Sequence, residues 1–306
     1  MIRNIVFAFL SMLCIVLICS GCAESEARTI PSTNHVIILG FDGWAGSSFE
    51  NASMPFVKSL LSESAWTIHK RSILPSSSAC NWASMFMGTD PEAHGYVAWD
   101  TSSPVFPQTD TNENGFFPNI FSLYRSVSKD YEFGYFYQWG GMKYIVDAKD
   151  FDTMQQFPVS KSGTIQMTAT AKKYIMNKKP ALAAFIWDYP DAVGHTTGWD
   201  SSEYLDELTN IDTIISDIVT ACKEAGIYDN TLFVITSDHG GHDKTHGTYD
   251  FRDLESPLIL FGKGVKKGVE IKTPVMQYDV AAILCNYLHL VPPASWRGKS
   301  VDGIFN

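Results

Sequence analysis

Short apolar runs alternate with longer amphipathic stretches along most of the chain. Five runs are short, apolar and rich in β-branched or aromatic residues, which predicts β-strands at residues 35–41, 131–137, 181–187, 231–237 and 257–261. The first run, HVIILGF, is apolar at nearly every position. Such a run is typical of a parallel strand that is covered on both faces, because an exposed face would bring in alternate polar residues.

Helical periodicity is clearest between residues 202 and 225. Gly226 supplies a stop, and the apolar residues recur at helical spacing at Leu205, Leu208, Ile211, Ile215, Ile218 and Cys222. Residues 54–62 and 277–288 are further predicted helices. Strands that alternate with helices in this way predict an α/β fold, with a mostly parallel central sheet and helices on both faces.

The N-terminal residues predict export. Arg3 precedes an apolar run over residues 5–18, which ends in small residues before Cys22. This is the pattern of a secretory signal, and the run is short for a membrane span. It resembles a bacterial lipoprotein signal, so we expect residues 1–21 to be removed, a lipid on Cys22 to hold the protein to a membrane, and residues 22–34 to form a tether. The location would be the periplasmic or outer-membrane face of the cell envelope. A plain cleaved signal and an uncleaved anchor are the alternatives.

Residues 97–160 differ from their surroundings. Positions 102–115 are rich in Pro, Asp, Asn and Thr, and several aromatic residues follow. We interpret this stretch as an insertion over the sheet, forming a small cap beside a substrate pocket, within one catalytic domain at residues 35–306.

Composition narrows the class of protein. The chain has 306 residues, of which 45% are hydrophobic and 18% charged, so it can bury a large core. Its net charge of −10 argues against a nucleic-acid-binding surface. Beyond Cys22 the cysteines stand far apart, at positions 80, 222 and 285, which is neither a disulfide framework nor a cysteine metal site.

Potential metal ligands follow three of the predicted strands. The carboxyl ends of parallel strands share one edge of a sheet, so side chains placed there converge. A mixture of carboxylate and imidazole suits zinc, and six or seven such groups are enough for two ions. Taken singly, each residue is equally compatible with a turn or a helix cap. The set comprises Asp42, Asp191, His195, Asp238, His239, His242 and His246.

A candidate nucleophile lies in the segment PSSSACN at residues 75–81. The serines lead into an apolar stretch, which predicts that Ser78 lies at or near a helix N-terminus, where free N–H groups favour a phosphoryl oxygen. A serine hydroxyl without a histidine partner needs a metal to activate it. The alternative is that Ser76, Ser77 or Ser78 is only an N-cap.

Taken in order, five motifs resemble those of the alkaline phosphatase superfamily, and of its nucleotide pyrophosphatase/phosphodiesterase branch in particular. The resemblance covers roughly residues 35–300, and QYDVAA and WRGK near the C-terminus are similar to the bacterial members. The motifs are FDG at 41–43, PSSSACN at 75–81, GTDPEAHG at 88–95, DAVGH at 191–195 and SDHGG at 237–241 with THG at 245–247.

The resemblance implies an alkaline phosphatase-like sandwich and two metal sites. The first would use Asp42, Ser78, Asp238 and His239, and the second Asp191, His195 and a third histidine. His246 matches the family position better than His242, whose contribution stays open. The family usually has threonine where this chain has Ser78. Asn81 matches an asparagine that holds a phosphoryl oxygen, Trp82 stands where histidine is often found, and His94 is expected to be structural.

These residues predict a hydrolase that cleaves a small phosphate ester with two divalent ions, for which the ligand types favour zinc, through a phosphoserine on Ser78. No arginine or lysine stands near Ser78, which favours a diester over a dianionic monoester. Asn81 and Trp82 would contact substrate, and Lys143 would either reach a substrate charge from the cap or be a solvated surface lysine. A phosphomonoesterase, a phosphonate hydrolase and a non-catalytic binding protein are the alternatives.

Overall fold

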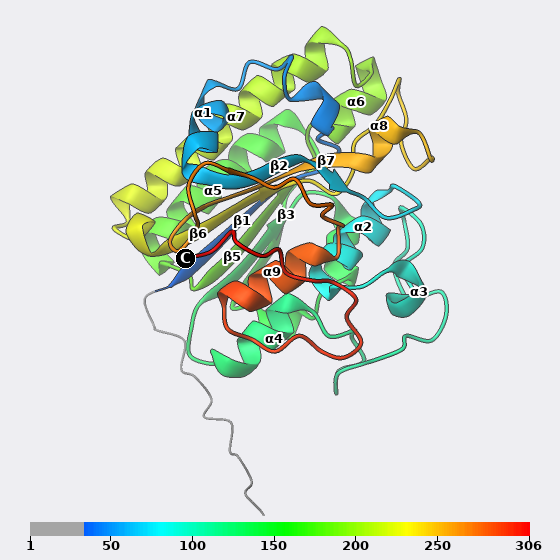
Figure 1. The fold of residues 1–306 in the computed structure, drawn as a ribbon, viewed down its shortest axis with the longest axis vertical. Helices are drawn as coiled ribbons and strands as arrows, with labels where there is room; N and C mark the ends of the chain where they lie inside the picture. Colours follow the sequence, from blue (N-terminus) through cyan, green and yellow to red (C-terminus); the bar gives the residue numbers. More distant parts are fainter. Residues whose placement is uncertain (1–33) are drawn as a thin grey trace, which may run out of the picture.

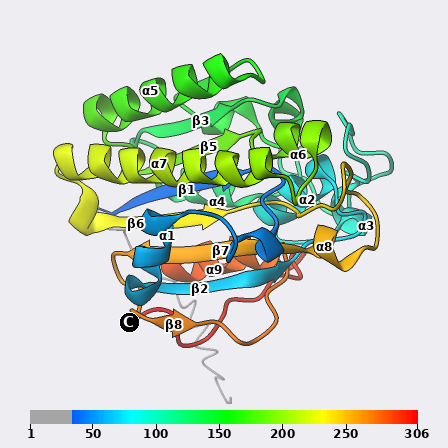
Figure 2. The same cartoon turned by 90° about the horizontal axis from the view of Figure 1, so that it is seen from above.

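A computed structural model describes residues 34–306, so the predicted signal sequence and Cys22 lie outside the described residues (Figure 1). One eight-stranded sheet forms the centre, with the order β4-β3-β5-β1-β6-β7-β2-β8 (Figure 2). The strands are β1 (His35–Phe41), β2 (Ser64–Arg71), β3 (Phe133–Tyr137), β4 (Thr153–Gln156), β5 (Leu182–Trp187), β6 (Thr231–Thr236), β7 (Glu255–Gly262) and β8 (Val269–Glu270).

The sheet is mostly parallel, as the sequence predicts. Only β7 runs antiparallel to its neighbours, β6 and β2. At the centre β1 pairs in parallel with β5 and β6, so that Ile38 lies opposite Ala184 on one side and Val234 on the other. Both of these neighbours of β1 are buried along their whole length. The α/β fold with a mixed, largely parallel sheet is therefore confirmed.

Helices cover both faces of the sheet (Figures 1 and 2). Ile37 and Leu39 of β1 point into one core, and Val36 and Ile38 point into the other, because successive strand residues face opposite sides. The first core lies under α1 (Pro55–Leu60), α5 (Lys161–Lys178) and α7 (Ser202–Glu224). The second lies under α2 (Ser78–Met87), α4 (Ile120–Val127) and α9 (Asp279–Tyr287).

The remaining helices are short. Three are α-helices of one or two turns: α3 (Pro91–His94), α6 (Asp191–Thr197) and α8 (Phe251–Leu254). The 3-10 helices are η1 (Gly46–Ser48), η2 (Leu61–Glu63), η3 (Gly140–Tyr144), η4 (Ala148–Asp150) and η5 (Tyr228–Asn230). None of the helices in residues 34–306 combines the length with the apolar character that crossing a bilayer requires. The three cysteines described are free and buried.

The expected insertion at residues 97–160 is smaller than predicted. Both β3 and β4 lie inside this range but are strands of the central sheet, with β3 buried between β4 and β5. The aromatic run FGYFY fills that buried position, so it belongs to the core and not to a cap. The irregular part is the loop from Val97 to Pro118, which precedes α4.

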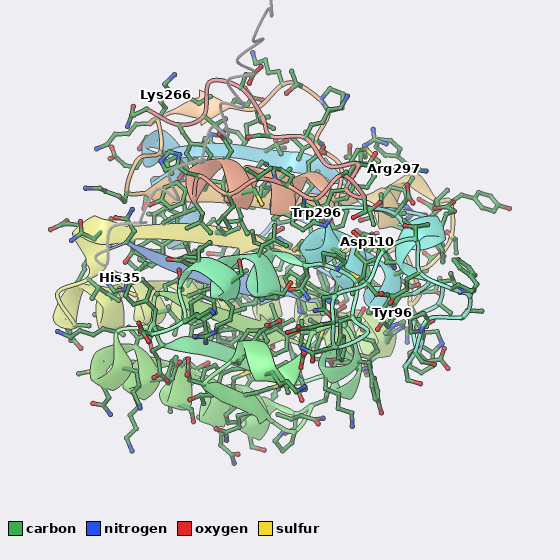
Figure 3. The ribbon with its side chains drawn as sticks, turned by 90° about the horizontal axis from the view of Figure 1, so that it is seen from below. His35, Tyr96, Asp110, Lys266, Trp296 and Arg297 are labelled. Carbon is green, nitrogen blue, oxygen red and sulfur yellow. The ribbon has the colours of Figure 1, made fainter. Side chains whose placement is uncertain are left out.

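The C-terminal segment holds this loop against the body of the protein (Figure 3). Ser295 donates a hydrogen bond to Asp110 at 2.7 Å, and the Trp296 indole donates to the Pro118 carbonyl at 3.0 Å. Arg297 forms an ion pair with Asp90, just before α3. The C-terminal segment thus contacts both this loop and the turn before α3.

Candidate metal centre

The carboxyl ends of the three central strands bring the candidate ligands together. Asp42 follows β1, and its backbone N–H donates to the Trp187 carbonyl at the end of β5. The backbone N–H of Asp191 donates in turn to the Asp42 carbonyl at 3.0 Å. Gly43 adopts a φ of +70°, and a Cβ atom there would come within 2.8 Å of Asp191 Cβ, so only glycine permits this approach.

Four side chains form an inner group. His239 Nε2 lies 3.4 Å from Asp42 Oδ1 and 3.3 Å from Asp238 Oδ2. The Ser78 hydroxyl lies 3.4 Å from Asp42 Oδ1 and 3.3 Å from His239 Nε2. Ser78 is the first residue of α2, and all four side chains are buried. The residues expected to hold the first metal are therefore adjacent to one another.

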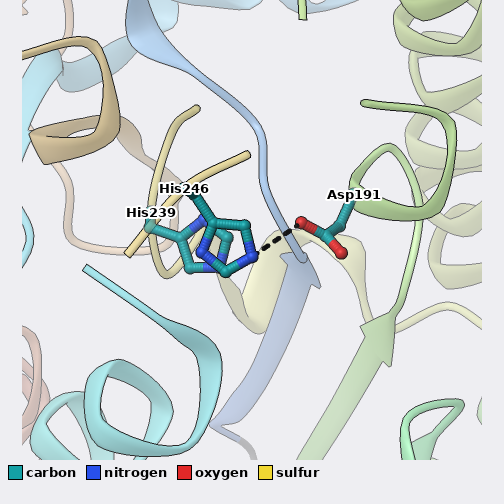
Figure 4. A group of neighbouring side chains, drawn as sticks. All are labelled: Asp191, His239 and His246. Atoms are coloured by element: carbon teal, nitrogen blue, oxygen red, sulfur yellow. Dashed lines mark ion pairs between the residues drawn. The ribbon is translucent and has the colours of Figure 1, made fainter. Parts of the chain in front are cut away.

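Three side chains form an outer group beside it. Asp191 lies between His195 Nε2, at 3.4 Å from Oδ2, and His246 Nε2, at 3.5 Å from Oδ1. The rings of His239 and His246 are stacked, with centroids 3.8 Å apart, and Figure 4 shows this stack facing Asp191. The outer group is thus continuous with the inner group through His239.

All three histidines are oriented in the same way. Each Nδ1 lies 2.7–3.0 Å from a backbone carbonyl: Gly240 for His239, Ser76 for His246 and Lys244 for His195. A carbonyl only accepts hydrogen bonds, so Nδ1 carries the proton and Nε2 presents its lone pair to the site. Histidine ligands are commonly prepared for a metal in this way.

The electrostatics of the site favour cations. Burial and the neighbouring Asp238 raise the pKa of Asp42, and burial raises the pKa of Asp238 to about 6. Burial also lowers the pKa of both His239 and His246 to about 3, so these rings are neutral at pH 7. Neutral Nε2 atoms therefore face carboxylate oxygens as lone pair against lone pair.

Two buried carboxylate oxygens at this edge, Asp191 Oδ1 and Asp238 Oδ2, have no hydrogen-bond partner. An unpartnered buried carboxylate oxygen costs free energy unless a cation or a donor occupies the adjacent space. Each lies in a group of three candidate ligand atoms within 4.8 Å of one another: Asp42, Asp238 and His239 in one, and Asp191, His239 and His246 in the other. These residues fit divalent cations.

Ser78 is not the N-cap of its helix. Ser77 holds that position, in an extended conformation, and its side chain makes no capping hydrogen bond. The hydroxyl of Ser77 instead lies 3.3 Å from Cys80 Sγ. The first turn of α2 is thus left without a side-chain cap at the point where Ser78 meets Asp42 and His239.

The predicted substrate contacts of Asn81 and Trp82 are wrong. The Asn81 carboxamide is fully buried, accepts from the Ile73 N–H at 2.7 Å and donates to three backbone carbonyls of residues 73–77. It has no donor left for a phosphoryl oxygen, and it holds the segment before Ser78 in place. Trp82 is also fully buried, and its indole N–H donates to Asp42 Oδ2 at 3.0 Å.

Lys143, His242 and His94 lie outside the ligand groups. Lys143 is exposed, with its ammonium over the Tyr144 ring, and is absent from the pocket wall. His242 pairs with Asp253 at 2.6 Å. His94 is buried against Ser84 at 2.9 Å, and burial lowers its pKa to about 3, in keeping with a structural role.

A pocket of about 620 Å³ opens beside Ser78 and the outer group. Its wall contains three residues that sequence reasoning missed: Trp99, Trp139 and Asp188. Asp188 directly follows β5, and this position at a strand end is the sequence feature that could have identified it. Burial and the charge of Asp238 raise the pKa of Asp188 to about 7. Among the residues that the structure describes, no lysine or arginine lines this pocket.

A sheet edge of this composition, on this fold, places the chain in the alkaline phosphatase superfamily. Within it, the chain belongs to the type I phosphodiesterase / nucleotide pyrophosphatase family, whose model matches residues 36–256.

Relatives of known name are similar at low identity. The bis(5'-adenosyl)-triphosphatase ENPP4 of Homo sapiens is 22% identical over 249 residues, which cover 72% of this chain and 50% of that protein. GPI ethanolamine phosphate transferase 1 of Chaetomium globosum is 36% identical over 78 residues, or 25% of this chain and 8% of that protein. The chain spans about half the length of the ENPP4 relatives that it matches.

Solved structures share the fold. Murine ectonucleotide pyrophosphatase / phosphodiesterase 5, in an inactive form bound to AMP, has a TM-score of 0.73 at 14% identity, with 89% of this chain and all of that chain covered. A 2-O GAG sulfatase has a TM-score of 0.69 at 15% identity, covering 88% of this chain and 73% of that one.

Proposed function

We propose that the protein is a metal-dependent hydrolase of phosphate diesters that uses Ser78 as its nucleophile and two zinc ions as cofactors. The observation that carries the proposal is the arrangement of neutral Nε2 atoms and unpartnered carboxylate oxygens around the Ser78 hydroxyl. Bound cations would relieve this arrangement and would also lower the pKa of the Ser78 hydroxyl.

The inner group would hold one ion through Asp42, Asp238, His239 and the Ser78 hydroxyl. The outer group would hold the other through Asp191, His195 and His246. Bound ions supply Lewis-acid activation of oxygen nucleophiles and of leaving groups. Carboxylates mixed with imidazole in small shells favour zinc over magnesium or calcium.

The reaction begins at Ser78. Its Oγ forms a bond to phosphorus while the bond from phosphorus to the leaving-group oxygen breaks. The proton of the Ser78 hydroxyl passes through water to that leaving oxygen, which departs as an alcohol. Uncapped N–H groups in the first turn of α2 would bind a non-bridging oxygen. They would thereby fill the role that the sequence predicts for Asn81. Water then cleaves the phosphoserine ester and restores the hydroxyl.

The pocket favours a diester over a monoester. A monoester dianion carries one more negative charge, and sites that select it usually supply an additional cation. This pocket offers Asp188, which adds negative charge, and the indoles of Trp99 and Trp139. A phosphomonoesterase would need Lys143 to supply this additional cation, and Lys143 is absent from the pocket wall.

The experiment is a comparison of bis-p-nitrophenyl phosphate with p-nitrophenyl phosphate, in the wild-type protein and in Ser78→Ala. We expect a higher kcat/KM for the diester, about two zinc ions per chain, and near-complete loss of turnover with retained metal in Ser78→Ala. A preference for the monoester would overturn the diesterase assignment. Activity in Ser78→Ala would overturn the nucleophile.

We also propose that the protein is anchored to a membrane by a lipid on Cys22, on the evidence of the signal pattern alone. Cys22→Ser should move the protein from the membrane fraction to the soluble fraction of its host without changing kcat. If the wild-type protein and Cys22→Ser are found in the same fraction, whether membrane or soluble, the lipid anchor is contradicted.

A further inference from the structure

Lys70, near the end of β2, is a fully buried lysine that the proposed reaction does not use. The register between β2 and β7 shifts between Thr67 and Lys70, where β2 gains one residue relative to its partner. Such a bulge turns the following side chains to the opposite face. His69 is therefore exposed, and Lys70 points inward, behind the turn that carries Asp238 and His239.

The Lys70 ammonium binds two neutral oxygens. It donates to the Ser237 carbonyl at 2.6 Å and to Gln277 Oε1. The carboxamide nitrogen of Gln277 donates to the carbonyl of Asn81 at 3.3 Å and lies 3.5 Å from the same Ser237 carbonyl. The side chains of Lys70 and Gln277, which we call the bracket, thus join the turn that carries Asp238 and His239 to the first turn of α2.

Neighbouring side chains hold the same turn. Ser72, two residues after Lys70, donates to the Asp238 carbonyl at 2.7 Å, and Ser256 donates to the Ser237 carbonyl at 3.3 Å. Lys70 is the charged member of this set. A charge-assisted hydrogen bond in a dry environment fixes its acceptor more firmly than a neutral one.

The position is costly for an ammonium. Burial lowers the pKa of Lys70 to about 7, and only the charge of Asp238 opposes this effect. No carboxylate pairs with Lys70 among the ion pairs of the described residues. A well-packed apolar residue would often be as stable or more stable in such a place. Retaining a lysine is therefore easier to explain by the site than by stability.

We propose that Lys70 and Gln277 are positioning residues of the metal centre, which hold the Asp238–His239 turn at a fixed distance from Ser78. This inference rests on the proposed function, because it assigns Lys70 a role in that same site. Lys70 touches no reacting atom and acts through the Ser237 carbonyl.

The test is Lys70→Met, which keeps the length of the side chain and removes its charge and donors. We expect kcat on bis-p-nitrophenyl phosphate to fall about 10- to 100-fold with KM changed less than about threefold, since misplacing a ligand by roughly 1 Å has costs of this order. Amide hydrogen exchange in peptides covering residues 236–242 should accelerate, while the melting temperature of the metal-free protein stays the same or rises.

Arg71→Met is the matched control. Arg71 is the next residue on the same strand, but it points away from the site, toward Glu255 and the Phe251 ring. We expect wild-type kcat and wild-type exchange in residues 236–242. Equal losses in the two variants would show a general effect of altering β2 and would overturn the proposal.

Unchanged kcat and unchanged exchange in Lys70→Met would also overturn the inference, while leaving the proposed function intact if the wild type is active. If the wild type itself lacks diesterase activity, the proposed function fails, and the exchange measurement still tests the bracket. Should Lys70→Met not fold, Gln277→Leu decides: it removes the bracket without stranding a metal ligand, and we expect a smaller loss of kcat with the same faster exchange. Wild-type values in Gln277→Leu would overturn the proposal.

Discussion

The inner and outer ligand groups share one edge of the sheet but differ in how they are held. The His239 side chain in the inner group is 0% exposed, whereas the His195 side chain in the outer group is 45% exposed. Inner residues are supported from several directions, by the Trp82 indole, the Gly43 N–H and the Ser72 hydroxyl. His195 stands on the two-turn helix α6, where its Nδ1 contacts the carbonyl of Lys244 and its ring lies against those of Trp199 and His246.

This difference in burial suggests that the two groups have different roles in the proposed reaction. A buried, fully braced group holds its geometry and excludes water, which suits an ion that activates the nucleophile. An outer group with an exposed histidine opens directly to the pocket, which suits the site where leaving group and water exchange with solvent.

Replacing His239, the inner-group residue that contacts the outer group, should have the largest effect. His239→Ala removes the Nε2 atom that lies 3.4 Å from Asp42 and the ring that stacks on His246. We expect loss of at least one metal equivalent and a fall in kcat/KM on the order of 10⁴ or more, comparable to removal of a member of a catalytic unit. Elemental analysis and the diester assay measure both. Substantial activity in this variant would remove the inner group from the reaction.

Replacing the exposed ligand should have a milder and reversible effect. His195→Ala leaves Asp191 and His246 in place, so we expect metal affinity and activity to fall about 10- to 100-fold, the range seen when metal surroundings are altered. Added zinc should restore part of the activity, because an exposed position can be filled by water. If excess zinc restores nothing, the two groups do not differ in the way proposed.

The pH dependence of metal binding should come from the carboxylates and not from the histidines. Asp238 has a raised pKa of about 6 and must lose its proton to bind metal, whereas His239 and His246, with a pKa of about 3, are already neutral. Metal affinity should therefore rise as the pH increases from 5 to 7, and binding should release protons at pH 6. Calorimetry in buffers of different ionisation enthalpy measures this release. If the rise of metal affinity between pH 5 and 7 disappears in His246→Asn, the titrating group is the histidine and not the carboxylate.

The smallest effect is expected at His242. This ring pairs with Asp253 outside both groups, and Asp253 also accepts from the Thr248 N–H at 3.0 Å. His242→Ala should keep its metal and lose less than about threefold in kcat/KM, because the pair orients the loop and not the ions. His246→Ala is its comparison variant, with a large loss of metal expected. Similar behaviour of the two variants would contradict the choice of His246.

Much of the fold was predictable from local patterns. The strands at the centre of the sheet are continuous apolar runs, and they stand out because both of their faces are buried. In contrast, β2 has the sequence SAWTIHKR, with three charged or polar residues at its end, and was missed. It lies near the edge of the sheet and carries a bulge, so neither a continuous run nor an alternation marks it. Helix α5 was missed because its sequence is mostly polar.

The candidate ligands were predictable for a related reason. Asp42 comes directly after β1, whereas Asp238 and Asp191 come a few residues after the ends of β6 (Thr236) and β5 (Trp187). Parallel topology gathers these three residues at one edge. The contacts of Asn81, in contrast, could not be predicted from its position in the sequence. Its position three residues after Ser78 suggested a substrate contact, but in a helix that spacing turns the carboxamide back toward the preceding segment, where four backbone groups bind it. Pairing over long distances in sequence is not visible in the local pattern.

The strand order has a consequence for the folding of the protein. Neighbours of β1 in the sheet are β5 and β6, so Ile38 meets partners about 146 and 196 positions away along the chain, Ala184 and Val234. Contacts of such high sequence separation form slowly, since most of the chain must be ordered before they are made. Only after both pairings are complete do Asp42, Asp191 and Asp238 come together at the edge where the two proposed ions would bind. Zinc taken up during refolding would therefore record the closing of the central sheet, and would lag behind the appearance of helical structure.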